Sequence, residues 1–182
     1  VLLLGHGHQH FSDIQKLPNL HAMIALLRDG FHPQSEGGSI ELAGDGTPII
    51  DYVINDYLWD GVRRSWLSMA EIQFAAGAKA VRASHVDSPW FTSWEEAKAG
   101  INALEFRSNA FTAGSAHCMG GLTMGEDQTR CLVDSNGKYH HLDNLYVFDG
   151  SVFPTSIGAN PQLSIYGMAC KQANKLLETL KA

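Results

Sequence analysis

The chain has 182 residues, and 13 Lys and Arg against 19 Asp and Glu give it a formal net charge of −6. This acidic balance argues against a nucleic-acid-binding protein, which would carry a basic excess, and no apolar run approaches the roughly 18 to 20 residues of a membrane-spanning helix. The three cysteines share no metal-ligand or redox spacing, so neither a disulfide framework nor a thiolate zinc site is indicated.

The first segments predict a short helix followed by a hairpin. Apolar residues at helical spacing, with a glycine after them, predict a helix over residues 19–29. Residues 39–42 and 48–52 then flank a turn sequence that contains Asp45 and Gly46. Such turn residues between two apolar stretches are typical of an antiparallel β-hairpin.

The middle of the chain predicts two further helices. The first runs over residues 56–76 and is closed by a glycine, and Val81 after it starts a return strand. Ser93 and Glu96 have the spacing of a capping box, which predicts a helix over residues 94–104.

The last third contains fewer regular elements. Residues 145–148 predict a short apolar strand, and Pro161 begins a long final helix. Apolar residues recur along one stripe of this helix: Leu163, Tyr166, Cys170, Ala173, Leu177 and Leu180. A hairpin combined with several helices predicts a mixed α+β fold.

A histidine-rich segment near the start has three interpretations. Two glycines and His6, His8 and His10 superficially resemble a dinucleotide-binding loop, but the third glycine is missing. On a strand, the alternating histidines would lie on one face and could bind a metal ion. The simplest interpretation is a polar loop at the edge of a cleft.

Two other positions have residue types that suit chemistry. His117 lies among small residues that let a flat ring approach the backbone, and an imidazole can accept a proton near neutral pH. Asn160 before Pro161 predicts a capped helix N-terminus. The amides and dipole of that N-terminus could also stabilise a group that becomes negative during a reaction.

Three motifs then occur in order: SAHCMG with MGED in residues 115–127, NLYVFDGSVFP in residues 144–154, and GANP in residues 158–161. Together they resemble the C-terminal region of glucose-methanol-choline (GMC) oxidoreductases. Within that family the chain leans towards long-chain alcohol oxidases and bacterial sugar or polyol dehydrogenases. The resemblance implies FAD-dependent oxidation of a small alcohol or sugar, with hydride passed to flavin N5.

The resemblance also implies roles for individual residues. His117 matches the catalytic histidine, which acts as the base, and Asn160 matches a second position whose amide orients the substrate oxygen. Asp149 and Gly150 would lie along the sugar-alcohol or phosphate chain of FAD. Cofactor binding at the pyrimidine edge would involve Asn160 together with its two neighbours, Pro161 and Gln162.

The resemblance further implies a division of the chain. Residues 1–110 are expected to belong to an antiparallel-sheet substrate domain with helices. Residues 111–182 are expected to hold the catalytic histidine and the strand-loop-helix that completes an FAD-binding α/β domain. Gly121 stands where many members have Thr or Ser, which removes any hydroxyl contact there.

The family's N-terminal glycine-rich loop for the ADP half of FAD is not present in this sequence. The chain is therefore expected to work with an N-terminal FAD-binding portion of the same enzyme or with a partner chain that supplies one. The low charged fraction, 18% against ~25% in soluble domains, agrees with a covered surface. Two alternatives stay open: a non-catalytic subunit or truncated fragment that serves as a structural or binding module, and a metal-binding domain built on the three N-terminal histidines.

Overall fold

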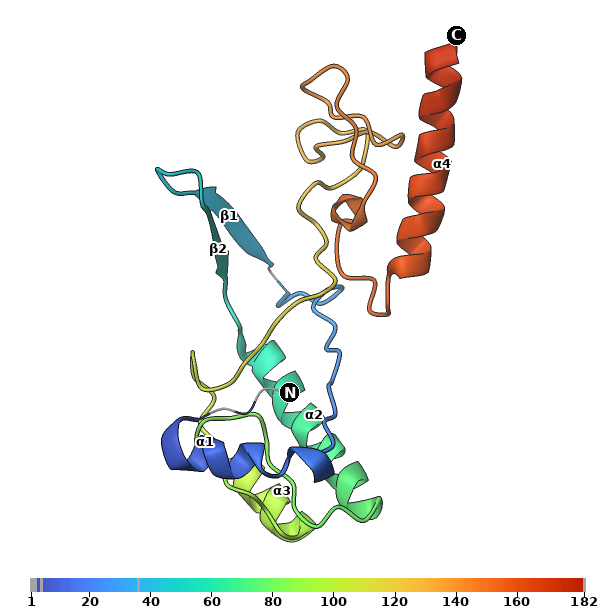
Figure 1. Ribbon diagram of the computed structural model, residues 1–182. Coiled ribbons are helices and arrows are strands. Elements are labelled where there is room, and N and C mark those ends of the chain that lie inside the picture. The colour runs from blue at the N-terminus through green and yellow to red at the C-terminus, as the bar shows by residue number, and fades with distance from the viewer. Residues whose placement is uncertain (1–2, 4, 36, 182) are drawn as a thin grey trace. The chain divides into compact units, whose positions relative to one another are not determined.

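The computed structural model describes residues 3, 5–35 and 37–181 (Figure 1). In chain order the helices and strands are α1 (Gly7–Ile14), β1 (Gly38–Leu42), β2 (Pro48–Tyr52), α2 (Asp56–Ala75), α3 (Trp94–Ala103) and α4 (Gln162–Lys181), with 3-10 turns at Leu17–Asn19 and Gly150–Val152. This combination of helices with a two-stranded antiparallel sheet confirms the α+β class. Among the described residues, no helix is long and apolar enough to cross a membrane.

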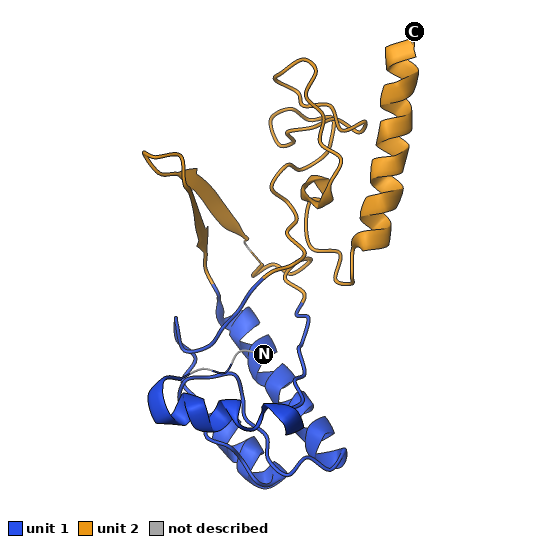
Figure 2. Cartoon of the chain, in the orientation of Figure 1, with its two compact units in different colours: residues 1–27, 54–114 blue, residues 28–53, 115–182 orange. Residues whose placement is uncertain are grey.

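The chain forms two compact units, each made of two stretches of sequence (Figure 2). Unit 1 comprises residues 1–27 and 54–114, and unit 2 comprises residues 28–53 and 115–182. Every candidate catalytic or cofactor-binding residue named above therefore belongs to unit 2. The division into domains at residue 110 stays a prediction.

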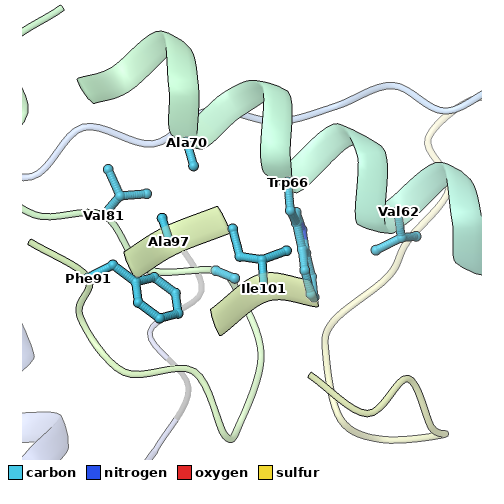
Figure 3. Packing of buried hydrophobic residues seen from close by; sticks show 8 residues of the cluster. Val62, Trp66, Ala70, Val81, Phe91, Ala97 and Ile101 are labelled. Carbon is cyan, nitrogen blue, oxygen red and sulfur yellow. The ribbon is translucent and has the colours of Figure 1, made fainter. Parts of the chain in front are cut away.

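The core of unit 1 lies between α2 and α3 (Figure 3). Helix α2 contributes residues four positions apart, which places them on one face of the helix. Helix α3 packs so closely that a Cβ atom at Gly100 would lie 2.2 Å from Cε1 of Phe91. The buried cluster consists of Val62, Trp66, Ala70, Val81, Ala83, Phe91, Ala97 and Ile101.

The end of α2 and the start of α3 have the geometry that their sequences predict. Gly77 has a φ of 90°, and the amides of Gly77 and Ala78 donate to carbonyls in the last turn of α2, which ends that helix. At the start of α3, Ser93 Oγ accepts from the amide of Glu96 at 3.2 Å. The carboxylate of Glu96 accepts from the Thr92 amide at 2.9 Å, one residue before the usual capping-box partner.

The hairpin of unit 2 is also confirmed. β1 pairs antiparallel with β2, with Ile40 opposite Ile50. Asp45 Oδ1 accepts from the Thr47 amide at 2.9 Å, and Gly46 has a φ of 83°, so this turn needs a residue that tolerates the left-handed region. Every residue of both strands is exposed.

The prediction of a helix over residues 19–29 is wrong. The chain leaves helical geometry at Leu20, whose ψ is 128°, directly after the 3-10 turn. Residues 20–30 form no regular element, and Ile24 is 84% exposed. Short helices depend on packing of their apolar face, and Ile24 at the centre of this face is left uncovered.

The two short strands predicted from apolar sequence are present only as single bridges. Val81 pairs with Phe91 and Tyr146 pairs with Lys138, and neither pairing extends into a ladder. A run of apolar residues becomes a strand only where a neighbouring segment pairs with it along its length.

A buried carboxylate links α1 to a distant loop within unit 1. Asp13 is 2% exposed and accepts from Arg82 Nη1 at 2.6 Å, Trp90 Nε1 at 3.0 Å and Lys16 Nζ at 2.7 Å. The hydrogen bond from Lys16 holds the pKa of the Asp13 carboxyl below its ordinary value, against burial, which raises it.

We expect Asp13→Asn to lower the free energy of unfolding by about 3 kcal/mol at neutral pH, because the largely buried Arg82 loses its carboxylate partner. Since the folded pKa is the lower one, this stabilisation is complete above the ordinary pKa of about 3.9 and is lost as the pH falls through the folded value. Denaturant unfolding at neutral pH and at about pH 3 checks this. Equal losses on acidification in parent and variant would contradict it.

Candidate active site

One pocket in unit 2 is lined by all six candidate catalytic and cofactor-binding residues. Its volume is about 570 Å³. It is lined by Ala116, His117, Cys118, Met119, Asp149, Gly150, Ser151, Asn160, Pro161, Gln162, Ile165 and Tyr166. Three separate segments of sequence therefore meet here: the histidine loop, the 3-10 turn at Gly150–Val152 and the start of α4.

Backbone hydrogen bonds hold the histidine loop beside the 3-10 turn. The amide of Leu122 donates to the Ser151 carbonyl at 3.0 Å, and the amide of Met124 donates to the Val152 carbonyl at 3.0 Å. Gly120 has a φ of 87° and turns the loop over Pro154. His117 is half-buried in the pocket wall, and its imidazole makes no hydrogen bond to any residue that the structure describes.

The 3-10 turn is organised by Asp149. Its Oδ1 atom accepts from the amide of Ser151 at 2.8 Å and from the Ser151 hydroxyl at 2.5 Å. A Cβ atom at Gly150 would lie 3.1 Å from Cδ1 of Ile165 and 3.4 Å from the Cys118 carbonyl oxygen. A glycine at this position therefore lets α4 and the histidine loop approach the same turn.

Helix α4 starts one residue later than a cap at Asn160 requires. The carbonyl of Pro161 accepts the first helical hydrogen bond, from the amide of Ile165 at 2.9 Å, and Pro161 is buried. Asn160 is exposed, and its side chain makes no hydrogen bond within the described ranges, so the predicted side-chain cap is not formed. No described side chain accepts from the first-turn amides either, which leaves them available to a ligand.

Several pocket residues were not among the predicted site residues, and Tyr166 is the most informative of them. The sequence places Tyr166 on the apolar stripe of the last helix, but it is exposed and lines the pocket. Its hydroxyl accepts from Gln162 Nε2 at 2.5 Å. The four-residue spacing from Gln162, which places both on one helix face, is the signal that could have found it.

The N-terminal histidines do not form the arrangement that a metal site on a strand requires. His6 precedes α1, and His8 and His10 lie within this helix. Residues two positions apart on a helix do not face each other, so the shared face of a strand is lost. No cluster of three His, Cys, Asp or Glu side chains suited to a metal ion occurs in the part of the chain that the structure describes.

Comparison with known families identifies the chain's relatives. The sequence model of the GMC oxidoreductases matches residues 33–169, which is well over half of the chain. The chain belongs to the GMC oxidoreductase family. Members of this family are FAD-dependent flavoprotein oxidoreductases, and the present chain corresponds to their C-terminal part.

Individual relatives agree with this placement. The chain is 37% identical over 84 residues to 6'''-hydroxyparomomycin C oxidase from Streptomyces lividus, covering 46% of this chain and 15% of that protein. It is 29% identical over 150 residues to an uncharacterized GMC-type oxidoreductase from Sinorhizobium fredii, covering 80% and 28%. A long-chain-alcohol oxidase from Arabidopsis thaliana is 25% identical over 161 residues, covering 81% and 20%. The chain thus spans less than a third of the length of these relatives.

Proposed function

We propose that this chain supplies the substrate-binding and proton-handling part of an FAD-dependent enzyme that oxidises a CH–OH group of an alcohol or sugar. The observation that carries the proposal is the single pocket that holds His117, Asn160 and the predicted cofactor-binding residues together. Relatives named as a paromamine 6'-oxidase and a long-chain-alcohol oxidase support an alcohol or sugar substrate.

His117 is the proposed base. Its half-buried imidazole lines the pocket and forms no bond with a described side chain or carbonyl that would occupy the ring nitrogens. Bound FAD supplies the hydride acceptor. His117 takes the hydroxyl proton of the substrate, while the Asn160 amide, which cannot titrate as a base, donates to the same oxygen and holds it in place.

The start of α4 fits the pyrimidine edge of a flavin. Its first-turn amides are uncapped by described side chains, and Asn160, Pro161 and Gln162 at this end of the helix line the pocket. The positive end of the helix dipole favours negative charge in this position by on the order of 0.3 to 2 kcal/mol. These features support the proposed contact of the three residues with the cofactor.

Asp149 and Gly150 suit the sugar-alcohol chain of FAD better than its phosphates. The Oδ1 atom of Asp149 accepts hydrogen bonds from Ser151, and Asp149 is an exposed residue that lines the pocket. A carboxylate accepts hydrogen bonds from hydroxyl groups and repels phosphate oxygens. We therefore propose that this turn meets ribityl hydroxyls.

The uncovered face of α4 is the proposed docking surface for the FAD-binding portion of the enzyme. The apolar stripe predicted along this helix is exposed, with Leu163 at 84% and Leu180 at 73%. The opposite side of the helix packs within unit 2 through the buried Gln172 and the half-buried Ile165 and Leu176. Because the relatives are several times longer than the matched part of this chain, the covering segment is expected among their additional residues.

This assembly is testable with one charged substitution and a matched control. Leu177→Asp places a charge in the exposed stripe and is expected to prevent copurification of the chain with the FAD-binding portion and its flavin absorbance. Thr179→Asp adds the same charge on the polar side of α4, where the exposed Thr179 hydroxyl donates to the Lys175 carbonyl, and should leave the yellow complex intact. Equal recovery of flavin with both variants would contradict the proposed surface.

A further inference from the structure

The segment that begins unit 2 packs against the loop that leads to Asn160. Gly30 is buried, and a Cβ atom there would lie 2.3 Å from Oγ1 of Thr155 and 3.2 Å from the carbonyl oxygen of Ser156. Only a glycine leaves room for this approach. The contact joins two stretches that lie far apart in the sequence but within the same unit.

Arg28 extends this contact towards the site. A Cβ atom at Gly158 would lie 2.5 Å from Cδ and 2.9 Å from Nε of Arg28, so the arginine side chain covers the glycine. The guanidinium carbon of Arg28 lies 4.5 Å from the ring centroid of Phe31. The exposed Arg28 side chain therefore contacts both the Phe31 ring and Gly158.

Gly158 and Phe31, the two residues that Arg28 contacts, both have unusual backbone conformations. Gly158 has a φ of 74° and Phe31 a φ of 55°, both in the left-handed region, which is unusual for a side chain as large as Phe31. Asp29 accepts a hydrogen bond from the hydroxyl of Ser35, which ties the same segment to the residues after it. Backbone strain of this kind persists where the surrounding contacts hold it.

The position of Asn160 depends on the residues that pack against its loop. It follows Gly158 by two residues, so their Cα atoms are at most about 7.6 Å apart. The Asn160 side chain has no hydrogen bond to any residue within the described ranges, and the loop's own bond from the Gly158 amide to Ser156 Oγ is long, at 3.3 Å. Contacts from outside the loop are thus a main constraint on where Asn160 lies.

We propose that Arg28 is a positioning residue for Asn160: by covering Gly158 while stacked on Phe31, it fixes the loop from which the Asn160 amide reaches the substrate oxygen. This inference rests on the proposed role of Asn160. Misplacement of an orienting group by as little as 1 Å can cost a large factor in rate.

The test is a double-mutant cycle in the complete enzyme, that is, this chain with its FAD-binding portion. Arg28→Ala should slow flavin reduction by a substrate alcohol about tenfold, with FAD affinity and melting temperature unchanged. Arg28→Lys, which keeps the aliphatic stem and the charge, should restore most of the rate. In an Asn160→Ala background, Arg28→Ala should have almost no further effect, because coupled residues are not additive.

Phe31→Leu gives a second, independent variant, since it removes the ring beneath the guanidinium and leaves Arg28 in place. Phe31→Leu should also slow flavin reduction, and it should have almost no further effect in the Asn160→Ala background. Arg64→Ala, at an exposed arginine on α2 in unit 1, is the matched control and should reduce flavin at the parental rate.

The outcomes separate the two claims. If Asn160→Ala slows reduction but Arg28→Ala slows it by the same factor in both backgrounds, or not at all, the positioning role of Arg28 is overturned and the proposed function stands. If Asn160→Ala reduces flavin at the parental rate, the proposed role of Asn160 is wrong and the inference about Arg28 falls with it.

Discussion

Replacement of His117 by alanine is expected to slow flavin reduction by a substrate alcohol about 10² to 10⁴-fold in the complete enzyme, the usual scale for loss of a general base. FAD should stay bound, because in the proposed arrangement the cofactor is held by the start of α4 and by the 3-10 turn. Rapid mixing under anaerobic conditions measures the rate, and the visible spectrum of the purified variant measures bound flavin.

His8 provides the control for this substitution. It is an exposed histidine on α1 in unit 1, outside the pocket, and His8→Ala should change the rate little. A His117→Ala enzyme that reduces its flavin at nearly the parental rate would remove His117 from the role of base.

Asn160→Asp is expected to slow flavin reduction on the order of a hundredfold, the scale of removing one oriented hydrogen-bond donor. Aspartate has no amide to donate, and its charge repels the negative charge that the reaction develops nearby. The melting temperature should stay unchanged or rise slightly, because a negative charge near the N-terminus of α4 is favourable and no described side-chain bond is lost.

Asn160→His distinguishes a donor role from a requirement for asparagine itself. An imidazole can still donate to the substrate oxygen, so this variant should be slowed less than Asn160→Asp. Rates and melting temperatures of both variants decide the matter. A stable Asn160→Asp enzyme with the parental rate would show that Asn160 acts only in the structure of the loop.

Local signals in the sequence predicted the elements whose geometry is set by neighbouring residues. The turn at Asp45 and Gly46, the cap at Ser93 and the closing glycine at Gly77 each act within a few residues, and the hairpin, α2 and α3 formed where these signals placed them. The final helix began within one residue of its predicted start.

Elements that depend on distant partners could not be predicted in this way. The apolar sequence over residues 19–29 predicted a helix, but nothing in the sequence showed that Ile24, at the centre of its apolar face, would remain uncovered. Asp13 gave no local sign that it would be buried, because its partners Arg82 and Trp90 lie 69 and 77 residues away.

The candidate site followed from motifs rather than from periodicity. His117, Asn160 and the cofactor residues were named from their resemblance to one family, and the structure places them around one pocket while their roles stay predictions. Tyr166 and Arg28 were not predicted as site residues because neither belongs to a motif. Tyr166 lines the pocket because it lies on the same face of α4 as Gln162. Arg28 contacts Gly158 because the fold of unit 2 brings these two distant residues together.

The most direct test of the central claim is anaerobic mixing of the complete enzyme with a panel of alcohols and sugars while the flavin absorbance is followed. At least one compound with a CH–OH group should bleach the oxidised flavin in a single exponential phase, and the His117→Ala enzyme should bleach much more slowly with the same compound. Bleaching that is equally fast in both enzymes, or that no alcohol or sugar produces in the parent, would contradict the assignment of this pocket as the site of alcohol oxidation.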